Sequence, residues 1–281
     1  MAAPRLRPAE WLAVAYFVYV ALLTPFFPAA RGRAWQAWLL AAIVAGICVL
    51  LSRLPGPGGC IARDWFPLLF TLAAYRQMDW FTPAVADHRL DLAFLAWDRW
   101  LFDHGLRAGI ESAGRLLPTI LEACYLLVYT VAPVALVALL KHGRREAIGR
   151  WWLAYLAGTL GAYALLPWFP SQPPRTAFAG EDLPHVTTWL RRMNLGILGG
   201  YGIHSSVFPS AHVSSAFSAA WGLLAVVPER RELGRWMAVY GCAVAIATVY
   251  GRYHYAADAV AGFAVSFAGV VALRLWPAGR G

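Results

Sequence analysis

Seven long apolar runs recur along the 281-residue chain, and they constrain its fold more than any other feature. A helix needs roughly 20 apolar residues to cross the hydrocarbon core of a bilayer. The runs are Trp11 to Ala30, Trp35 to Leu54, Pro118 to Leu140, Trp151 to Phe169, Pro209 to Val227, Trp236 to Tyr250 and Ala256 to Trp276. An eighth, weaker run, Trp65 to Trp80, carries Arg76 and Asp79 near its end. We therefore expect an all-α, polytopic transmembrane bundle of about eight spans.

The composition agrees with a membrane protein, because 60% of the residues are hydrophobic and only 14% are charged. The net charge of +9 would suggest a nucleic-acid partner in a soluble protein. Here the basic residues gather between the apolar runs, so we interpret them as topology signals and contacts to lipid headgroups, and we expect no nucleic acid. The four cysteines have no CxxC spacing. We expect neither a disulfide nor a metal site from them.

The basic residues also predict an orientation, since short cytoplasmic loops are enriched in Lys and Arg. Clusters of such residues stand at Lys141 to Arg150 and at Arg230 to Arg235, in short connections. The segments Thr82 to Leu117 and Ser171 to Phe208 are much longer. With eight spans, both termini are expected in the cytoplasm and both long loops on the extracytoplasmic side, in what we interpret as a bacterial inner membrane.

Polar residues at the start of the Pro209 to Val227 run indicate a binding site. Ser210 follows Pro209 and is expected to be the N-cap of a helix. The free N–H groups of a helix N-terminus suit a phosphate oxyanion. His212, in the first turn, would lie beside that phosphate and could protonate a departing alkoxide. A histidine that is merely bonded to a backbone carbonyl at the membrane interface is the alternative interpretation.

A second polar group stands at the start of the last span. His254 and Asp258 are four residues apart, so on a helix they share a face and can touch. A carboxylate bonded to one ring nitrogen would orient the imidazole and leave the other nitrogen free to attack phosphorus. Arg252 supplies a permanently charged fork that suits phosphate oxygens. Together these residues predict phosphoryl chemistry.

These residues form two recognisable strings, Phe208-Pro209-Ser210-Ala211-His212 and Arg252-Tyr253-His254-Tyr255-Ala256-Ala257-Asp258. They resemble the second and third signature motifs of the type 2 phosphatidic acid phosphatase (PAP2) superfamily. The compact Arg-Tyr-His-Tyr-x-x-Asp string is most similar to its inositol phosphorylceramide synthase-like branch. Ser171-Gln172-Pro173-Pro174-Arg175 resembles a Pro-Pro pair in the outer loop of that branch, although the chain has no Lys-x6-Arg-Pro string.

The resemblance implies a single membrane domain over 1–281, in which 64–276 form a PAP2-like core of six spans and 1–60 form two accessory spans. It also implies a two-step transfer that needs no metal and no cofactor. His254, oriented by Asp258, would form a phosphohistidine, while His212 protonates the leaving alcohol. Arg252, Arg175 and backbone N–H groups near Ser210 would hold the phosphate charge.

The implied partners are a membrane phospholipid or lipid phosphate and a hydroxyl acceptor. The branch resemblance favours a lipid phosphotransferase that transfers a phosphoryl or phospho-headgroup unit. The alternative is a phosphatase that hydrolyses phosphatidyl or polyprenyl phosphates. A transporter or a non-catalytic scaffold is a further alternative, but a conduit would need polar groups through the whole bilayer. The inner halves of the last three spans are nearly free of charge.

Overall fold

The computed structural model describes residues 6–85 and 87–277, and every regular element in these ranges is a helix. The α-helices are α1 Pro8–Leu23, α2 Ala34–Arg53, α3 Gly56–Trp65, α4 Pro67–Met78, α5 Arg89–Asp103, α6 Leu106–Glu111, α7 Leu116–Leu127, α8 Val131–Lys141, α9 Ile148–Leu165, α10 Pro174–Ala177, α11 Trp189–Tyr201, α12 Ala211–Val226, α13 Arg231–Tyr250, α14 Ala256–Ser266 and α15 Ala268–Leu275. The all-α prediction is confirmed. The ends of the expected 1–281 domain lie outside the described residues.

Five helical segments of the described chain are long and apolar enough to cross a membrane. They are Pro8–Phe26, Arg31–Arg53, Leu116–Lys141, Pro228–Tyr250 and Ala256–Leu275. The apolar helix α12 is shorter, with 16 residues. The weak eighth run forms α4, whose 12 residues extend only about 18 Å at a rise of about 1.5 Å per residue. The count of eight spans therefore stays a prediction.

Helices α9 and α12 form the centre of the bundle. Helix α9 packs against α1, α4, α12, α14 and α15, and most of its residues are buried. Gly158 permits the close approach of α12, because a Cβ atom at this position would lie 1.8 Å from the Ser218 hydroxyl oxygen. The Ser214 hydroxyl donates a hydrogen bond of 2.9 Å to the Gly158 carbonyl oxygen. Small residues in membrane helices commonly allow such backbone approach.

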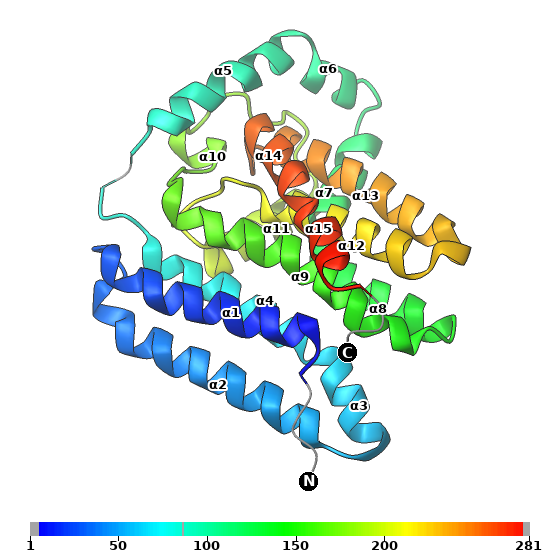
Figure 1. Ribbon diagram of the computed structural model, residues 1–281. Coiled ribbons are helices and arrows are strands. Elements are labelled where there is room, and N and C mark those ends of the chain that lie inside the picture. The colour runs from blue at the N-terminus through cyan, green and yellow to red at the C-terminus, as the bar shows by residue number, and fades with distance from the viewer. Residues whose placement is uncertain (1–5, 86, 278–281) are drawn as a thin grey trace.

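Helices α1 and α2 lie along one flank of the bundle, with α1 between α2 and α9 (Figure 1). Asp64, at the end of α3, holds this flank to the core. Its carboxylate pairs with Arg7 of the N-terminal segment and with Arg145, each at 2.8 Å. The Trp152 indole N–H of α9 donates to the Asp64 carbonyl oxygen at 2.8 Å. These contacts join the two N-terminal helices to the rest of the fold.

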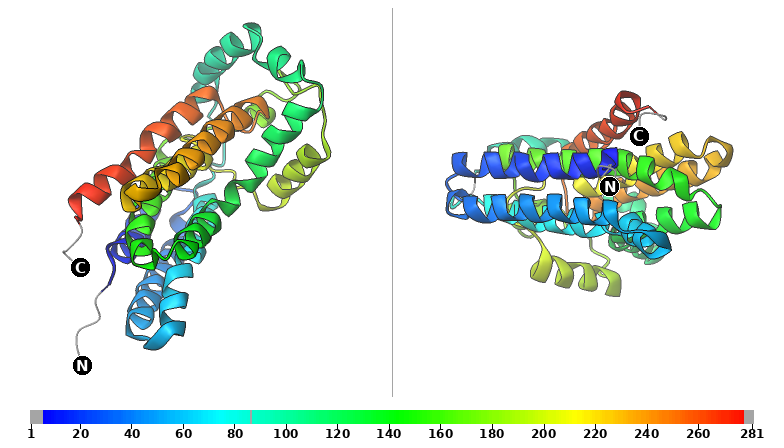
Figure 2. Two further views of the ribbon diagram at one scale, coloured as in Figure 1. Left: turned by 90° about the vertical axis from the view of Figure 1, so that its right-hand side faces the viewer. Right: turned by 60° about the horizontal axis from the view of Figure 1, so that its bottom comes forward.

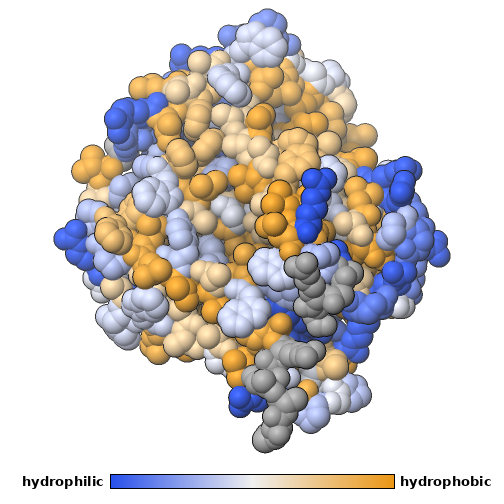
Figure 3. Space-filling model, in the orientation of Figure 1, coloured by the Kyte–Doolittle hydropathy of each residue, from blue (hydrophilic) through white to orange (hydrophobic). Residues whose placement is uncertain are grey.

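The outer surface of the bundle is largely apolar, as a membrane-embedded protein requires. Figure 3 shows hydrophobic residues over much of one face, with hydrophilic residues gathered toward its edges. On α2, exposed large side chains include Trp35, Trp38, Leu39, Ile43 and Leu50.

The helices α5 and α6 cross the end of the bundle that lies opposite α3 (Figures 1 and 2). The loop before α10, the loop after α11 and the turn between α13 and α14 approach one another below α5. The predicted motif residues lie on or next to these three loops.

Candidate active site

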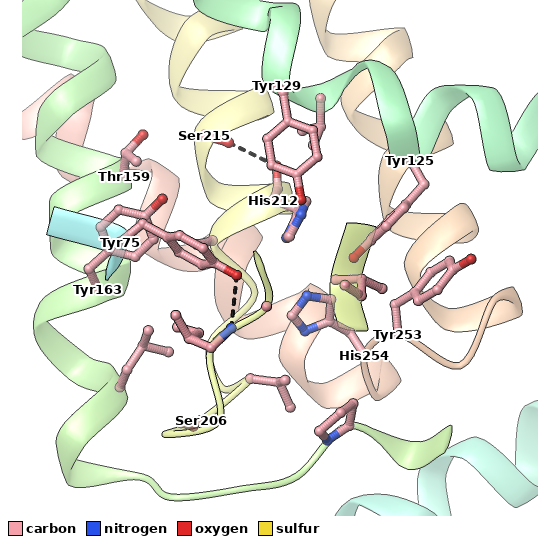
Figure 4. Close-up of a pocket in the computed structure, with 18 of the residues that line it drawn as sticks. Tyr75, Tyr125, Tyr129, Thr159, Tyr163, Ser206, His212, Ser215, Tyr253 and His254 are labelled. Carbon is pink, nitrogen blue, oxygen red and sulfur yellow. Dashed lines mark hydrogen bonds between the residues drawn. The ribbon is translucent and has the colours of Figure 1, made fainter. Parts of the chain in front are cut away.

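A cavity of about 570 Å³ lies where these loops meet the ends of the helices. Its wall is formed by α4, α9, α11, α12, the junction of α7 and α8, and the turn between α13 and α14. Figure 4 shows several of its polar side chains, namely Tyr75, Tyr125, Tyr129, Thr159, Tyr163, His212, Ser215, Tyr253 and His254. Leucines and alanines of α4, α8 and α11 complete the lining. Such a mixture of apolar surface and few convergent polar groups is typical of a ligand site.

His254 lies in the turn between the two membrane-spanning segments that end at Tyr250 and begin at Ala256. Its ring nitrogen Nδ1 is 3.2 Å from the Asp258 carboxylate, in the first turn of α14. The same carboxylate oxygen accepts a hydrogen bond of 2.9 Å from the Tyr255 amide. This is the contact that the i, i+4 spacing predicts, and the His254 ring also lines the cavity.

His212 lies in the first turn of α12, and its ring centre is 5.5 Å from that of His254. Its helix begins at Ser210, whose hydroxyl accepts the Val213 amide hydrogen bond, so the predicted N-cap is confirmed. The His212 ring stacks on Tyr125, with ring centres 5.0 Å apart. Its Nε2 atom is buried and has no hydrogen-bond partner among the described residues. The two histidines therefore share one cavity, with an unsatisfied nitrogen in it.

Arg175, on the short helix α10, also lines the cavity. Its amide donates to the Arg252 carbonyl oxygen at 3.2 Å, which joins two of the motif loops. Its guanidinium lies 5.5 Å from the centre of the Tyr253 ring and forms no ion pair with any carboxylate in the described chain. An unneutralised arginine beside two imidazoles makes the cavity suitable for an anion.

Arg252 and Ser210, also predicted as phosphate ligands, are fully buried and do not line the cavity. The Arg252 guanidinium pairs with Asp98 and lies 5.2 Å from the centre of the Phe102 ring. Its backbone has a φ of +58°, a left-handed conformation that is uncommon for a residue other than glycine. Such outliers cluster at functional sites. Direct phosphate binding by these two residues stays a prediction.

The environment of His254 favours its neutral form. The ring is buried and the positively charged Arg175 lies nearby, and together these lower the pKa of His254 to about 3. Both causes disfavour the imidazolium, because burial penalises charge and Arg175 repels a second cation. The ring is consequently unprotonated at neutral pH, which is the state that a nucleophile needs.

One buried polar network beside the cavity was not foreseen from the sequence. Glu122 of α7 accepts hydrogen bonds from Arg191 at 3.0 Å, from Asn194 at 2.7 Å and from the Tyr253 hydroxyl at 2.6 Å. Arg191 also donates to the Gly251 carbonyl oxygen at 3.1 Å. The network anchors α11 to α7 and supports the residue that precedes His254. A carboxylate inside an apolar run was the available signal.

Two buried aspartates of α5, Asp91 and Asp98, were also not foreseen. Asp91 accepts the Gln172 amide hydrogen bond at 3.0 Å, and Asp98 accepts that of Ala256 at 2.8 Å. Their seven-residue separation places them on the same face of a helix, and this was the signal in the sequence.

The helices and this site define the class of an integral membrane protein with a histidine-lined cavity. Residues 92–272 match the family model of the PAP2 superfamily, which is more than half of the chain. The chain therefore belongs to the PAP2 superfamily, and membership suggests phosphatase or phosphotransferase activity. The match lies inside the expected 64–276 core. No curated protein and no solved structure matches the chain.

Proposed function

We propose that this protein is a lipid phosphotransferase of the inositol phosphorylceramide synthase-like kind, which acts through a phosphohistidine. The observation that carries the proposal is that His254, which contacts Asp258, lines one cavity together with His212 and Arg175. The His254–Asp258 pair supplies an oriented nucleophile, His212 lies across from it, and Arg175 supplies positive charge. These residue types are the ones that phosphoryl transfer through a histidine needs, and their proximity supports the proposal.

In the first proposed step, the ring nitrogen of His254 that does not face Asp258 attacks the phosphorus of a lipid phosphoester. The N–P bond forms as the P–O bond to the leaving alcohol breaks. His212 takes up a proton when the phosphate anion binds beside it, and it gives this proton to the leaving oxygen. Asp258 holds the His254 ring and stabilises the positive charge on it. Arg175 stabilises the negative charge that develops on the phosphoryl oxygens.

In the second step, the hydroxyl group of an acceptor attacks the phosphorus. His212 takes the proton of this hydroxyl, and the N–P bond breaks to restore neutral His254. A lipid or polyol acceptor makes the protein a transferase, and water makes it a phosphatase. Apolar residues and tyrosines form most of the cavity wall, and a wall of this kind favours an organic acceptor over water.

We further propose that the site faces the extracytoplasmic side of a bacterial inner membrane, with both termini in the cytoplasm. The positive-inside rule supports this orientation. The basic residues Arg7, Arg144, Arg145 and Arg231 lie at the end of the bundle where α9 and α13 begin. The cavity lies where these helices end. We also propose the division into accessory spans in 1–60 and a core in 64–276.

The test is to incubate the detergent-solubilised protein with a panel of phospholipids and lipid phosphates, with and without diacylglycerol or ceramide, and to analyse the products by mass spectrometry. We expect a new headgroup lipid only when an acceptor is present. The H254A variant should give no product, and H142A, which changes an exposed histidine, should behave as wild type. Free phosphate with every substrate would instead support the phosphatase, and product from H254A would refute the mechanism.

A further inference from the structure

Helix α5 is the element that touches all the loops of the candidate site. It lies outside the predicted membrane spans and crosses the end of the bundle (Figure 1). Its buried residues are Asp91, Leu95, Asp98 and Phe102, which form one stripe at helical spacing. Two carboxylates in a buried stripe are costly unless they are paired. Their partners therefore indicate what the helix does.

Asp98 holds both sides of the turn that carries His254. One carboxylate oxygen pairs with the buried Arg252 guanidinium, two residues before His254. The other accepts the hydrogen bond of the Ala256 amide at 2.8 Å, two residues after it. The Ala256 amide is one of the N–H groups at the start of α14 that have no partner within the helix, and Asp98 of α5 accepts its hydrogen bond. A single side chain thereby fixes the two residues that flank His254.

The neighbouring residues of α5 reach the two other motif loops. Asp91 accepts the amide hydrogen bond of Gln172, three residues before Arg175. The Phe94 ring stacks on Phe208, which precedes the α12 N-terminus, with ring centres 5.0 Å apart. It also lies 5.7 Å from the Tyr255 ring, beside His254. One face of α5 thus contacts the loops before Arg175, before His212 and around His254.

We propose that α5 is the positioning element of the active site and that Asp98 is its principal positioning residue. None of the atoms of Asp98 lines the cavity, so it acts through Arg252 and the start of α14. It sets the distance and angle between the His254 ring, the His212 ring and Arg175. This inference rests on the proposed phosphotransfer, because its effect is measured on that reaction. A displacement of a reacting group by about 1 Å reduces a rate by roughly 10²-fold.

The experiment compares D98N and F94L with D103N. D98N keeps the side-chain shape and an oxygen for Ala256 but removes the charge that pairs with Arg252. F94L keeps apolar volume but loses both ring contacts. Asp103 lies on the same helix, is exposed and has no ion pair among the described residues, which makes D103N the matched control. For each variant, kcat is measured per site that can be labelled as phosphohistidine, together with KM and the thermal unfolding midpoint.

We expect D98N to lower kcat per labelled site by about 10- to 100-fold, with KM changed by less than about threefold. F94L should have a smaller effect in the same direction, and D103N should match wild type. A purely structural role predicts fewer labelled sites with normal kcat per site, and that result would overturn the proposal. If D98N does not fold, the F94L variant alone tests the proposal. A kcat of F94L equal to that of D103N would then refute the positioning role of α5.

A second measurement separates this inference from the proposed function. If wild-type protein turns over no phospholipid, the proposed function is refuted. Hydrogen–deuterium exchange then tests whether Asp98 holds the turn that carries His254. D98N should exchange faster than D103N in residues 251–257, with residues 131–141 unchanged. Equal exchange in 251–257 would mean that α5 does not hold the loop.

Discussion

Glu122 offers the clearest test of how the site is supported, because three side chains depend on one carboxylate within a predicted span. Arg191, Asn194 and the Tyr253 hydroxyl all donate to it, and Glu122 and Arg191 are 3% and 5% exposed. Replacing Glu122 by alanine leaves a buried guanidinium without its counter-charge. Breaking one partner of such a pair typically costs about 3–5 kcal/mol. We expect E122A to lose stability by about this amount.

The assay is thermal unfolding in a fixed detergent, with E146A as control. Glu146 is exposed, and a surface change of this kind shifts stability by less than about 0.5 kcal/mol. A chain of this size changes its midpoint by roughly 2 °C for each kcal/mol, so E122A should unfold about 6–10 °C below wild type.

A double-mutant cycle adds a sharper criterion. The variant that lacks both Glu122 and Arg191 should be more stable than the sum of the two single losses predicts, because it removes both charges. Additive losses, or a midpoint of E122A within 2 °C of E146A, would refute the buried network as a support of the Tyr253 turn.

Three further predictions concern the reaction itself. D258N should lower kcat by roughly 10²-fold or more because the His254 ring loses its oriented partner; a near-normal kcat would make Asp258 structural. R175A should lower kcat by roughly 10²–10³-fold, as for other charge-stabilising donors, while R192A, at an exposed arginine, should not; equal rates would exclude Arg175. Phosphoenzyme formation from an aryl phosphate whose leaving group needs no proton should stay constant from pH 7 to 5, because His254 has a pKa of about 3. A histidine with an ordinary pKa of about 6.5 would lower this rate about 25-fold over the same range.

The same low pKa has a consequence for stability, with a definite sign. The unfolded chain binds a proton at His254 below about pH 6.5, and the folded chain does not until about pH 3. The unfolded state therefore gains protons first as the pH falls, so the His254 contribution to stability decreases from pH 6.5 downward.

Local sequence patterns were enough to predict the helices, the Ser210 N-cap and the His254–Asp258 contact. Each depends on residues within about four positions, for which helical geometry fixes the neighbours. The apolar runs likewise reflect the backbone requirements of a membrane.

The hydrogen-bond partners of Arg252 and Tyr253 could not be predicted from the sequence, because they lie far away in the chain. Asp98 is 154 residues from Arg252, and Glu122 is 131 residues from Tyr253. Spacing carries no information at such separations, and only the packing of α5 and α7 brings these groups together. The sequence therefore indicated Arg252 as a phosphate ligand, whereas its guanidinium is bonded to Asp98 and does not line the cavity.

The most direct test of the account is to find where the phosphoryl group is held during turnover. Wild-type protein is mixed with substrate, quenched in alkali, digested and analysed by mass spectrometry under conditions that preserve phosphohistidine. We predict one phosphoryl group on His254, formed at least as fast as product appears and absent from H254A. A phosphoryl group on any other residue, or steady turnover with an unmodified His254, would contradict the mechanism.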